Sequence, residues 1–106
     1  MTTIFSQEDW IFLDPQNVAA LTSVKILSGE HSILYVCHDD DDGMWQFHTG
    51  ADVNEEDARI VALSEIVKRD PSIFGLADLP MGWIATRKSQ DDDWLRYQDL
   101  RVTADL

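Results

Sequence analysis

Short apolar runs dominate the hydrophobic pattern of this chain, and they predict strands more often than helices. The clearest pair is HSILYVCH at residues 31–38 and GMWQFHTG at residues 43–50. The first run is rich in β-branched and aromatic residues, and the second alternates, with Trp45 and Phe47 on one side. The aspartates between the runs end at Gly43, and two strands joined by a short Asp/Gly segment are typical of a β-hairpin.

The register of this hairpin decides which side chains share a face. If Asp39 pairs with Met44, one face carries alternate residues of both strands. These residues are Leu34, Val36, His38, Trp45, Phe47 and Thr49. A register slipped by one or two residues would give other partners, and the sequence leaves this open.

Several other segments carry weaker signals of secondary structure. We expect a strand at 18–21 and further strands at 83–89 and 94–98, because each run is mostly apolar or β-branched. The segment SVKILSG predicts a short helix, with Ser23 as its cap and Gly29 at its end.

The segment that begins at Asn54 has two interpretations. Asn54 and the three acids after it favour a helix start, whereas RIVAL at 59–63 also fits a buried strand. SEIVKRD then predicts a helix with Ile66 and Val67 inward, which Asp70-Pro71 ends. SIFGLADL, which follows, predicts another short helix or a turn.

Together these elements predict a single compact α+β domain over residues 1–106, with an antiparallel β-sheet and two or three short helices packed on it. A chain of 106 residues is near the commonest domain size. Its hydrophobic fraction of 44% and its four tryptophans indicate a folded globule.

The charge of the chain narrows the class of partner. Twenty acids against eight bases give a formal charge of -12, which repels nucleic acid and anionic membranes and attracts a basic protein. The single cysteine, Cys37, excludes an internal disulfide and fits a reducing compartment. No signal peptide and no membrane-spanning apolar run is evident, so we expect a cytoplasmic protein.

The run HDDDDGMWQFH at 38–48 raises the question of metal binding. Its aspartates do not follow the EF-hand spacing, because Gly43 stands where a third ligand is needed. Cys37 and His38 are neighbours in a predicted strand and therefore point to opposite faces, which disfavours a shared transition metal. We expect no metal and no other cofactor, a buried thiol at Cys37, and surface imidazoles at His38 and His48.

No residue pattern indicates catalysis. Cys37 lies inside a predicted strand, away from the helix termini and basic neighbours that activate a thiol. The serines lie in no nucleophile elbow, and the five glycines are isolated, so no phosphate-binding loop is present. The crowded acids lack the apolar pocket that acid–base catalysis needs. We therefore expect a protein that is not an enzyme.

An acidic run precedes a tryptophan twice, as DDDDGMW at 39–45 and as DDDW at 91–94. Two hairpin tips of one sheet would produce this echo. Core packing is the expected role of Trp45 and Trp83, since both have apolar neighbours. Trp94 is the best candidate for a partly exposed anchor, because aromatic side chains ringed by charge are typical of protein recognition sites.

Three segments, in this order, carry a family resemblance: ILYVCHDDDDGMWQFHTG, ARIVALSEIVKRDPSI and LADLPMGW. They resemble a widespread, largely uncharacterised bacterial family with a branch of immunity proteins from polymorphic toxin systems, the Imm33-like group. The resemblance covers about residues 17–94. It implies a compact α+β fold with an antiparallel sheet and provides no catalytic residues, and its immunity branch implies a toxin as the partner.

The leading hypothesis is a non-catalytic acidic module that presents its acidic loops to a basic protein partner, such as a toxin. The candidate partner-binding residues are Asp39, Asp40, Asp41, Asp42, Asp91, Asp92, Asp93 and Trp94. Two alternatives stay open: a small metal- or ligand-binding domain that uses the hairpin at 38–48, and a structural or regulatory domain whose acids serve solubility alone.

Overall fold

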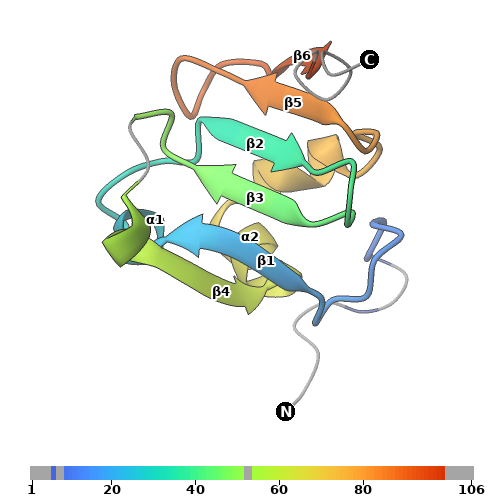
Figure 1. Cartoon of the computed structure of the whole chain (residues 1–106), viewed down its shortest axis with the longest axis horizontal. Coiled ribbons are helices and arrows are strands. Elements are labelled where there is room, and N and C mark those ends of the chain that lie inside the picture. The colour runs from blue at the N-terminus through green and yellow to red at the C-terminus, as the bar shows by residue number, and fades with distance from the viewer. Residues whose placement is uncertain (1–5, 7–8, 52–53, 100–106) are drawn as a thin grey trace.

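The strands predicted from the sequence pair into one six-stranded sheet in the computed structural model, which describes residues 6, 9–51 and 54–99. In chain order they are β1 (Ala19–Ser23), β2 (Tyr35–His38), β3 (Trp45–His48), β4 (Ala58–Ala62), β5 (Trp83–Thr86) and β6 (Leu95–Gln98). Across the sheet the order is β4-β1-β3-β2-β5-β6 (Figure 1).

Neighbouring strands in this sheet are antiparallel, except β1 and β3, which are parallel. The predicted α+β class with an antiparallel sheet is therefore confirmed, and the sheet is mostly antiparallel with one parallel pair. The parallel pair arises because β1 inserts between β3 and β4, far from its neighbours in sequence. Such pairing leaves no local pattern in the chain.

The helices are short, and a side chain caps the start of each described helix except α2. They are α1 (Val24–Leu27), α2 (Leu63–Arg69) and the 3-10 helices η1 (Glu55–Asp57) and η2 (Pro71–Leu76). Ser23 caps α1 as predicted, by accepting a hydrogen bond from the Lys25 N–H at 3.1 Å. No helix in the described residues is long and apolar enough to cross a membrane.

Both interpretations of the segment that begins at Asn54 hold in part. Asn54 caps the single turn of η1 by accepting a hydrogen bond from the Glu56 N–H. The chain then becomes extended as β4, whose first three residues are exposed, so the predicted strand is present but is not the buried strand that RIVAL indicated. The next helix, α2, buries Ile66 and Val67 as predicted.

The predicted hairpin is formed by β2 and β3, and its register is the one that places Asp39 opposite Met44. The Asp39 N–H donates to the Met44 carbonyl oxygen at 2.8 Å, and His38 lies opposite Trp45. Gly43 adopts a φ of 72°, a left-handed conformation that favours glycine at this turn.

One face of the sheet carries the core, and the helices pack against it. Val36 and Phe47 on this face are fully buried, and Trp45 is 2% exposed, which confirms its predicted place in the core. Trp83 is partly buried against the same cluster. Figure 1 shows α2 behind the sheet, while the face toward the viewer has no described helix over it.

Candidate functional site

The two acidic runs lie at opposite ends of the sheet. His38, next to the first run, pairs with Trp83 at the start of β5. Tyr35, at the other end of β2, pairs with Thr86, after which the chain enters the loop that holds the second run, Asp91–Asp93. Figure 1 shows the β2–β3 turn at one side of the sheet and the β5–β6 loop at the other. The fold therefore does not bring the two sets of predicted site residues together.

The first run forms the turn between β2 and β3, which we call the acidic turn (Asp39–Asp42). Its shape is fixed by hydrogen bonds from backbone N–H groups to carboxylates. The Asp42 N–H donates to Asp41 Oδ1, and the Met44 N–H donates to Asp42 Oδ1, both at 2.9 Å. Asp40, Asp41 and Asp42 are exposed, and within the described part of the chain no ion pair involves the turn. The turn thus presents negative charge in a fixed shape that no described ion pair neutralises.

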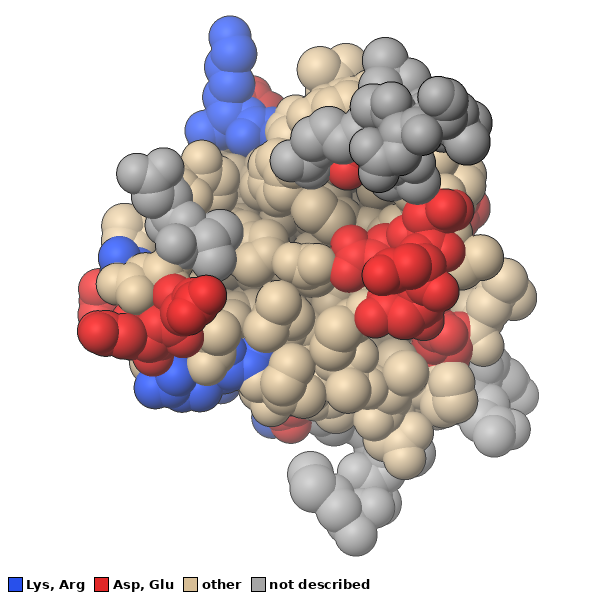
Figure 2. All heavy atoms as spheres, viewed as in Figure 1, with Lys and Arg blue, Asp and Glu red and all other residues tan. Residues whose placement is uncertain are grey.

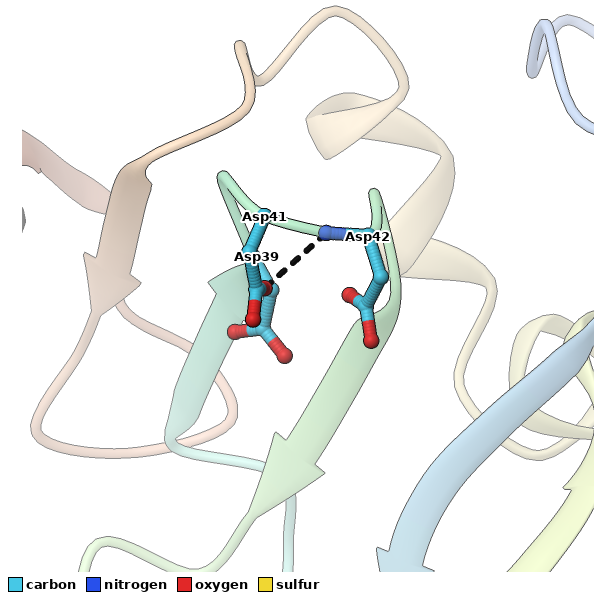
Figure 3. Close-up of side chains that lie close together, drawn as sticks. All are labelled: Asp39, Asp41 and Asp42. Carbon is cyan, nitrogen blue, oxygen red and sulfur yellow. Dashed lines mark hydrogen bonds between the residues drawn. The ribbon is translucent and has the colours of Figure 1, made fainter.

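Three of these carboxylates, from Asp39, Asp41 and Asp42, converge at the turn (Figure 3). One oxygen atom of each lies within 4.8 Å of the others. A hard cation prefers such ligands, although Ca²⁺ takes six to eight oxygens in all. Each carboxylate already accepts a hydrogen bond from the protein, which eases their mutual repulsion without a cation. The arrangement could hold a cation but does not need one.

A line of hydrogen bonds connects the acidic turn to a buried histidine. Gln46 Nε2 donates to Asp39 Oδ2 at 2.7 Å, and Gln46 Oε1 lies 2.9 Å from His48 Nε2. Because a carboxylate only accepts, the amide of Gln46 has one orientation and His48 Nε2 must carry a proton. His48 is 8% exposed, so the expected surface imidazole is wrong. Burial lowers the pKa of His48, and the negative charge of Asp39 partly opposes this shift.

Cys37 and His38 lie on opposite faces, as strand geometry predicts, but their surroundings differ from expectation. The His38 ring stacks on Trp45, with 3.9 Å between ring centroids, and its Nδ1 is 2.7 Å from the Leu79 carbonyl oxygen. Cys37 is half-buried where a buried thiol was expected. Alternation assigned the faces correctly, but the covering of each face depends on distant segments.

The second acidic run, Asp91–Asp93, lies beside a partly buried tryptophan and a buried arginine. Asp91, Asp92 and Asp93 are exposed, and the Ser89 hydroxyl donates to Asp92 Oδ2 at 3.1 Å. Trp94, which follows them, is partly buried, and the Arg87 Cζ lies 4.0 Å from the centroid of its ring. These contacts give Trp94 a structural role, and its role as a partner anchor stays a prediction.

Arg87 is a buried cation that the sequence analysis missed. Its Nη2 donates to Asp70 Oδ2 at 2.6 Å, its Nε to the Ile33 carbonyl oxygen at 3.0 Å, and its Nη1 to the Ser72 hydroxyl at 2.9 Å. The only sequence signal is its position two residues after Ala85, on the same face of β5. This network ties the end of β5 to the start of η2.

Comparison of the chain with family models, with curated proteins and with solved structures found no match. The description of the acidic turn therefore depends on its geometry alone. The resemblance to the Imm33-like group stays a prediction.

Proposed function

We propose that the protein is a non-catalytic binding module whose acidic turn docks on the basic surface of a protein partner. The observation that carries this proposal is the run of four carboxylates, held in one shape and not neutralised by any described ion pair. Fixed charge of one sign attracts a partner of the opposite sign and raises the association rate.

The distribution of the bases supports this choice of surface. Lys25, Arg87 and Arg96 each pair with a carboxylate away from the acidic turn. Figure 2 shows red side chains gathered at the side of the molecule where β2 turns into β3, without blue ones beside them. We assign the primary contact to this turn, because one small basic surface cannot meet both ends of the sheet.

The family resemblance suggests a more specific version of this proposal. In that version the protein works in the cytoplasm and the partner is a toxin, for example a nuclease whose basic substrate groove the acidic turn would block. A nucleic-acid or anionic-membrane partner is disfavoured, because the net charge of -12 repels polyanions.

Two variants with the same change in charge test the proposal. One replaces Asp40, Asp41 and Asp42 with Asn, and the other replaces Asp91, Asp92 and Asp93 with Asn. Each takes the formal charge from -12 to -9, because three acids are lost. Asn keeps a side-chain acceptor, so the hydrogen bonds within the acidic turn can persist.

The wild-type protein and both variants would be immobilised and exposed to a native bacterial lysate at low ionic strength. We expect basic proteins that elute with salt to be retained by the wild type and by the second variant, and lost by the first. If both variants lose the retained proteins equally, the remaining hypothesis is that the acids serve solubility alone. Retention that does not respond to ionic strength would contradict the attraction by charge.

The alternative of a metal- or ligand-binding domain at residues 38–48 stays a prediction, favoured by the convergence of Asp39, Asp41 and Asp42. Thermal unfolding with Ca²⁺, Mg²⁺, Mn²⁺ and Zn²⁺ in turn tests it. A large stabilisation by one ion at micromolar concentration, abolished by Asp41→Asn, would favour this function. Equal melting temperatures with and without each ion would exclude it.

A further inference from the structure

A groove of about 760 Å³ lies directly beside the acidic turn. Its walls come mainly from the N-terminal segment (12–14), the end of the acidic turn and the start of β3 (42–45), and the segment after η2 (77–81), with further contributions from residues 18, 19 and 38. Figure 1 shows the β2–β3 turn and the blue N-terminal segment at the same side of the molecule. The groove and the acidic turn therefore belong to one end of the molecule.

The walls of the groove are mostly apolar, and part of this apolar surface faces solvent. Leu13 is fully exposed and Met81 is 54% exposed, although both are large hydrophobic residues. Met44 also lines the groove, and methionine side chains adapt readily to differently shaped apolar partners. Exposed apolar surface of this kind, next to polar residues, marks sites of interaction.

The rim of the groove is negatively charged. Asp14, Asp42 and Asp78 line it, and none of its described lining residues is Lys or Arg. Asp78 already pairs with Arg96, at 2.8 Å between Asp78 Oδ1 and Arg96 Nη1. A cationic ligand would therefore find the carboxylates of Asp14 and Asp42 beside an apolar floor, whereas an anionic ligand would be repelled. Charge complementarity thus selects a basic occupant.

Hydrogen bonds hold the walls of the groove together before anything binds. Trp45 Nε1 donates to Asp14 Oδ2 at 2.9 Å, which fixes the N-terminal segment against β3. His38 contacts the Leu79 carbonyl oxygen through Nδ1, and the Gly82 N–H donates to the His38 carbonyl oxygen at 2.6 Å. A groove that is already formed costs little ordering on binding, so its contacts contribute more to affinity.

We infer that this groove receives the apolar side chains of a peptide segment of the partner, whose flanking Lys or Arg residues meet the rim carboxylates. The inference rests on the proposed function and adds the short-range contacts that charge alone does not supply. A small apolar ligand is disfavoured, because such sites enclose most of the ligand, whereas Leu13 and Met81 leave this groove open. Apolar anchors between basic residues follow the usual pattern of peptide recognition in a groove.

A phage-displayed library of random short peptides, selected against the full chain at low ionic strength, tests the inference. We expect selected peptides to combine leucine or an aromatic residue with neighbouring Lys or Arg. The double variant Leu13→Ser, Met81→Ser should weaken the binding of a selected peptide at least about tenfold. Leu95→Ser is the matched control: Leu95 is 66% exposed on β6, outside the groove, and its loss should leave binding unchanged. Circular dichroism would verify that all variants fold.

Each other outcome has a distinct meaning. Peptides rich in Lys and Arg but without apolar positions, or binding that the double variant leaves unchanged, would overturn the groove and leave the acidic turn as the docking surface. Peptides without basic residues would overturn both proposals, and a failure to enrich any peptide would overturn the groove. A dimer in sedimentation that the double variant dissociates would replace the partner with a second copy of this chain.

Discussion

The two acidic runs are similar in sequence, but the residues that pack beneath them differ. Trp45, after the first run, is 2% exposed, and its Nε1–H donates a hydrogen bond to Asp14 Oδ2. Trp94, after the second run, lies against the Arg87 guanidinium, and its buried Nε1 has no partner among the described residues. An apolar core thus supports the acidic turn, whereas a buried cation lies beneath the loop at Asp91–Asp93.

This difference shows that a run of acids does not define a site by itself. Arg87 lies close to the second run, where it donates to the Gln90 carbonyl oxygen and packs on Trp94, but its charge is already paired with Asp70. At the acidic turn no described base has this position, and an apolar groove adjoins the charge. Segments far away in the sequence decide which run is suited to a partner.

The largest expected effect comes from Arg87→Met, which leaves Asp70 buried without its cation. We expect the free energy of unfolding to fall by about 3–5 kcal/mol, the usual cost of breaking a buried ion pair from one side. Equilibrium urea unfolding measures it. Lys25→Met is the control, since the Lys25–Asp57 pair at 3.7 Å is partly exposed and should contribute about 1 kcal/mol or less. Equal losses would contradict the special stabilising role of the buried Arg87–Asp70 pair beneath the second run.

The next largest effect is the difference in stability lost when Trp45 or Trp94 is replaced. Trp45→Phe deprives Asp14 of its hydrogen-bond donor and opens a gap in the core, so we expect a loss of about 2 kcal/mol. Trp94→Phe removes a buried donor that has no described partner, so it should cost about 1 kcal/mol or less. Urea unfolding of both variants makes the comparison, and a larger loss for Trp94→Phe would contradict it.

The free energy of unfolding should depend on pH through His48, which hydrogen bonds connect to the acidic turn. Because burial lowers the pKa of His48 in the folded state from 6.5, the unfolded chain binds its proton first as the pH falls. Stability should therefore decrease as the pH falls below about 6.5, and His48→Gln should remove this decrease. Asp39→Asn removes the charge that opposes the shift and should make the decrease steeper. Urea unfolding from pH 7 to about 5.5 measures the slopes, and identical slopes for wild type and His48→Gln would exclude this role.

The smallest effect compares the acidic runs themselves. Replacing Asp40, Asp41 and Asp42 with Asn removes like-charge repulsion, so stability should rise by about 0.5 kcal/mol at low ionic strength and less at high salt. The matched change at Asp91, Asp92 and Asp93 should gain less, because among the described residues these carboxylates do not converge as those of the acidic turn do. Urea midpoints at two salt concentrations decide the order, and a reversed order would contradict this difference in repulsion.

Local patterns in the sequence predicted much of the fold. The alternation around Trp45 and Phe47 predicted the hairpin, and the structure adopts one of the registers that the sequence left open. Ser23 identified the start of α1. The parallel pairing of β1 with β3 could not be predicted, because residues 19–23 carry no information about which distant strand they join. Topology of this kind is a property of the whole chain.

The candidate site was predictable to a smaller extent. The hairpin signal placed the acidic turn at the tip of two strands, and alternation separated Cys37 from His38. The burial of His48 and the Arg87–Asp70 pair were missed, because each depends on segments that meet only in the folded chain. The groove was missed for the same reason, since segments that are far apart in the sequence form it.

The internal position of β1, between β4 and β3, has a consequence for the order in which the protein can fold. β1 is the first strand along the chain, yet its two neighbours, β3 and β4, end at His48 and Ala62. During synthesis β1 must therefore wait until β3 has emerged, and by then the β2–β3 hairpin, whose contacts are local, can form as well. We expect this hairpin to act as the template to which β1 adds, with β4 closing one edge and β5 and β6 extending the other.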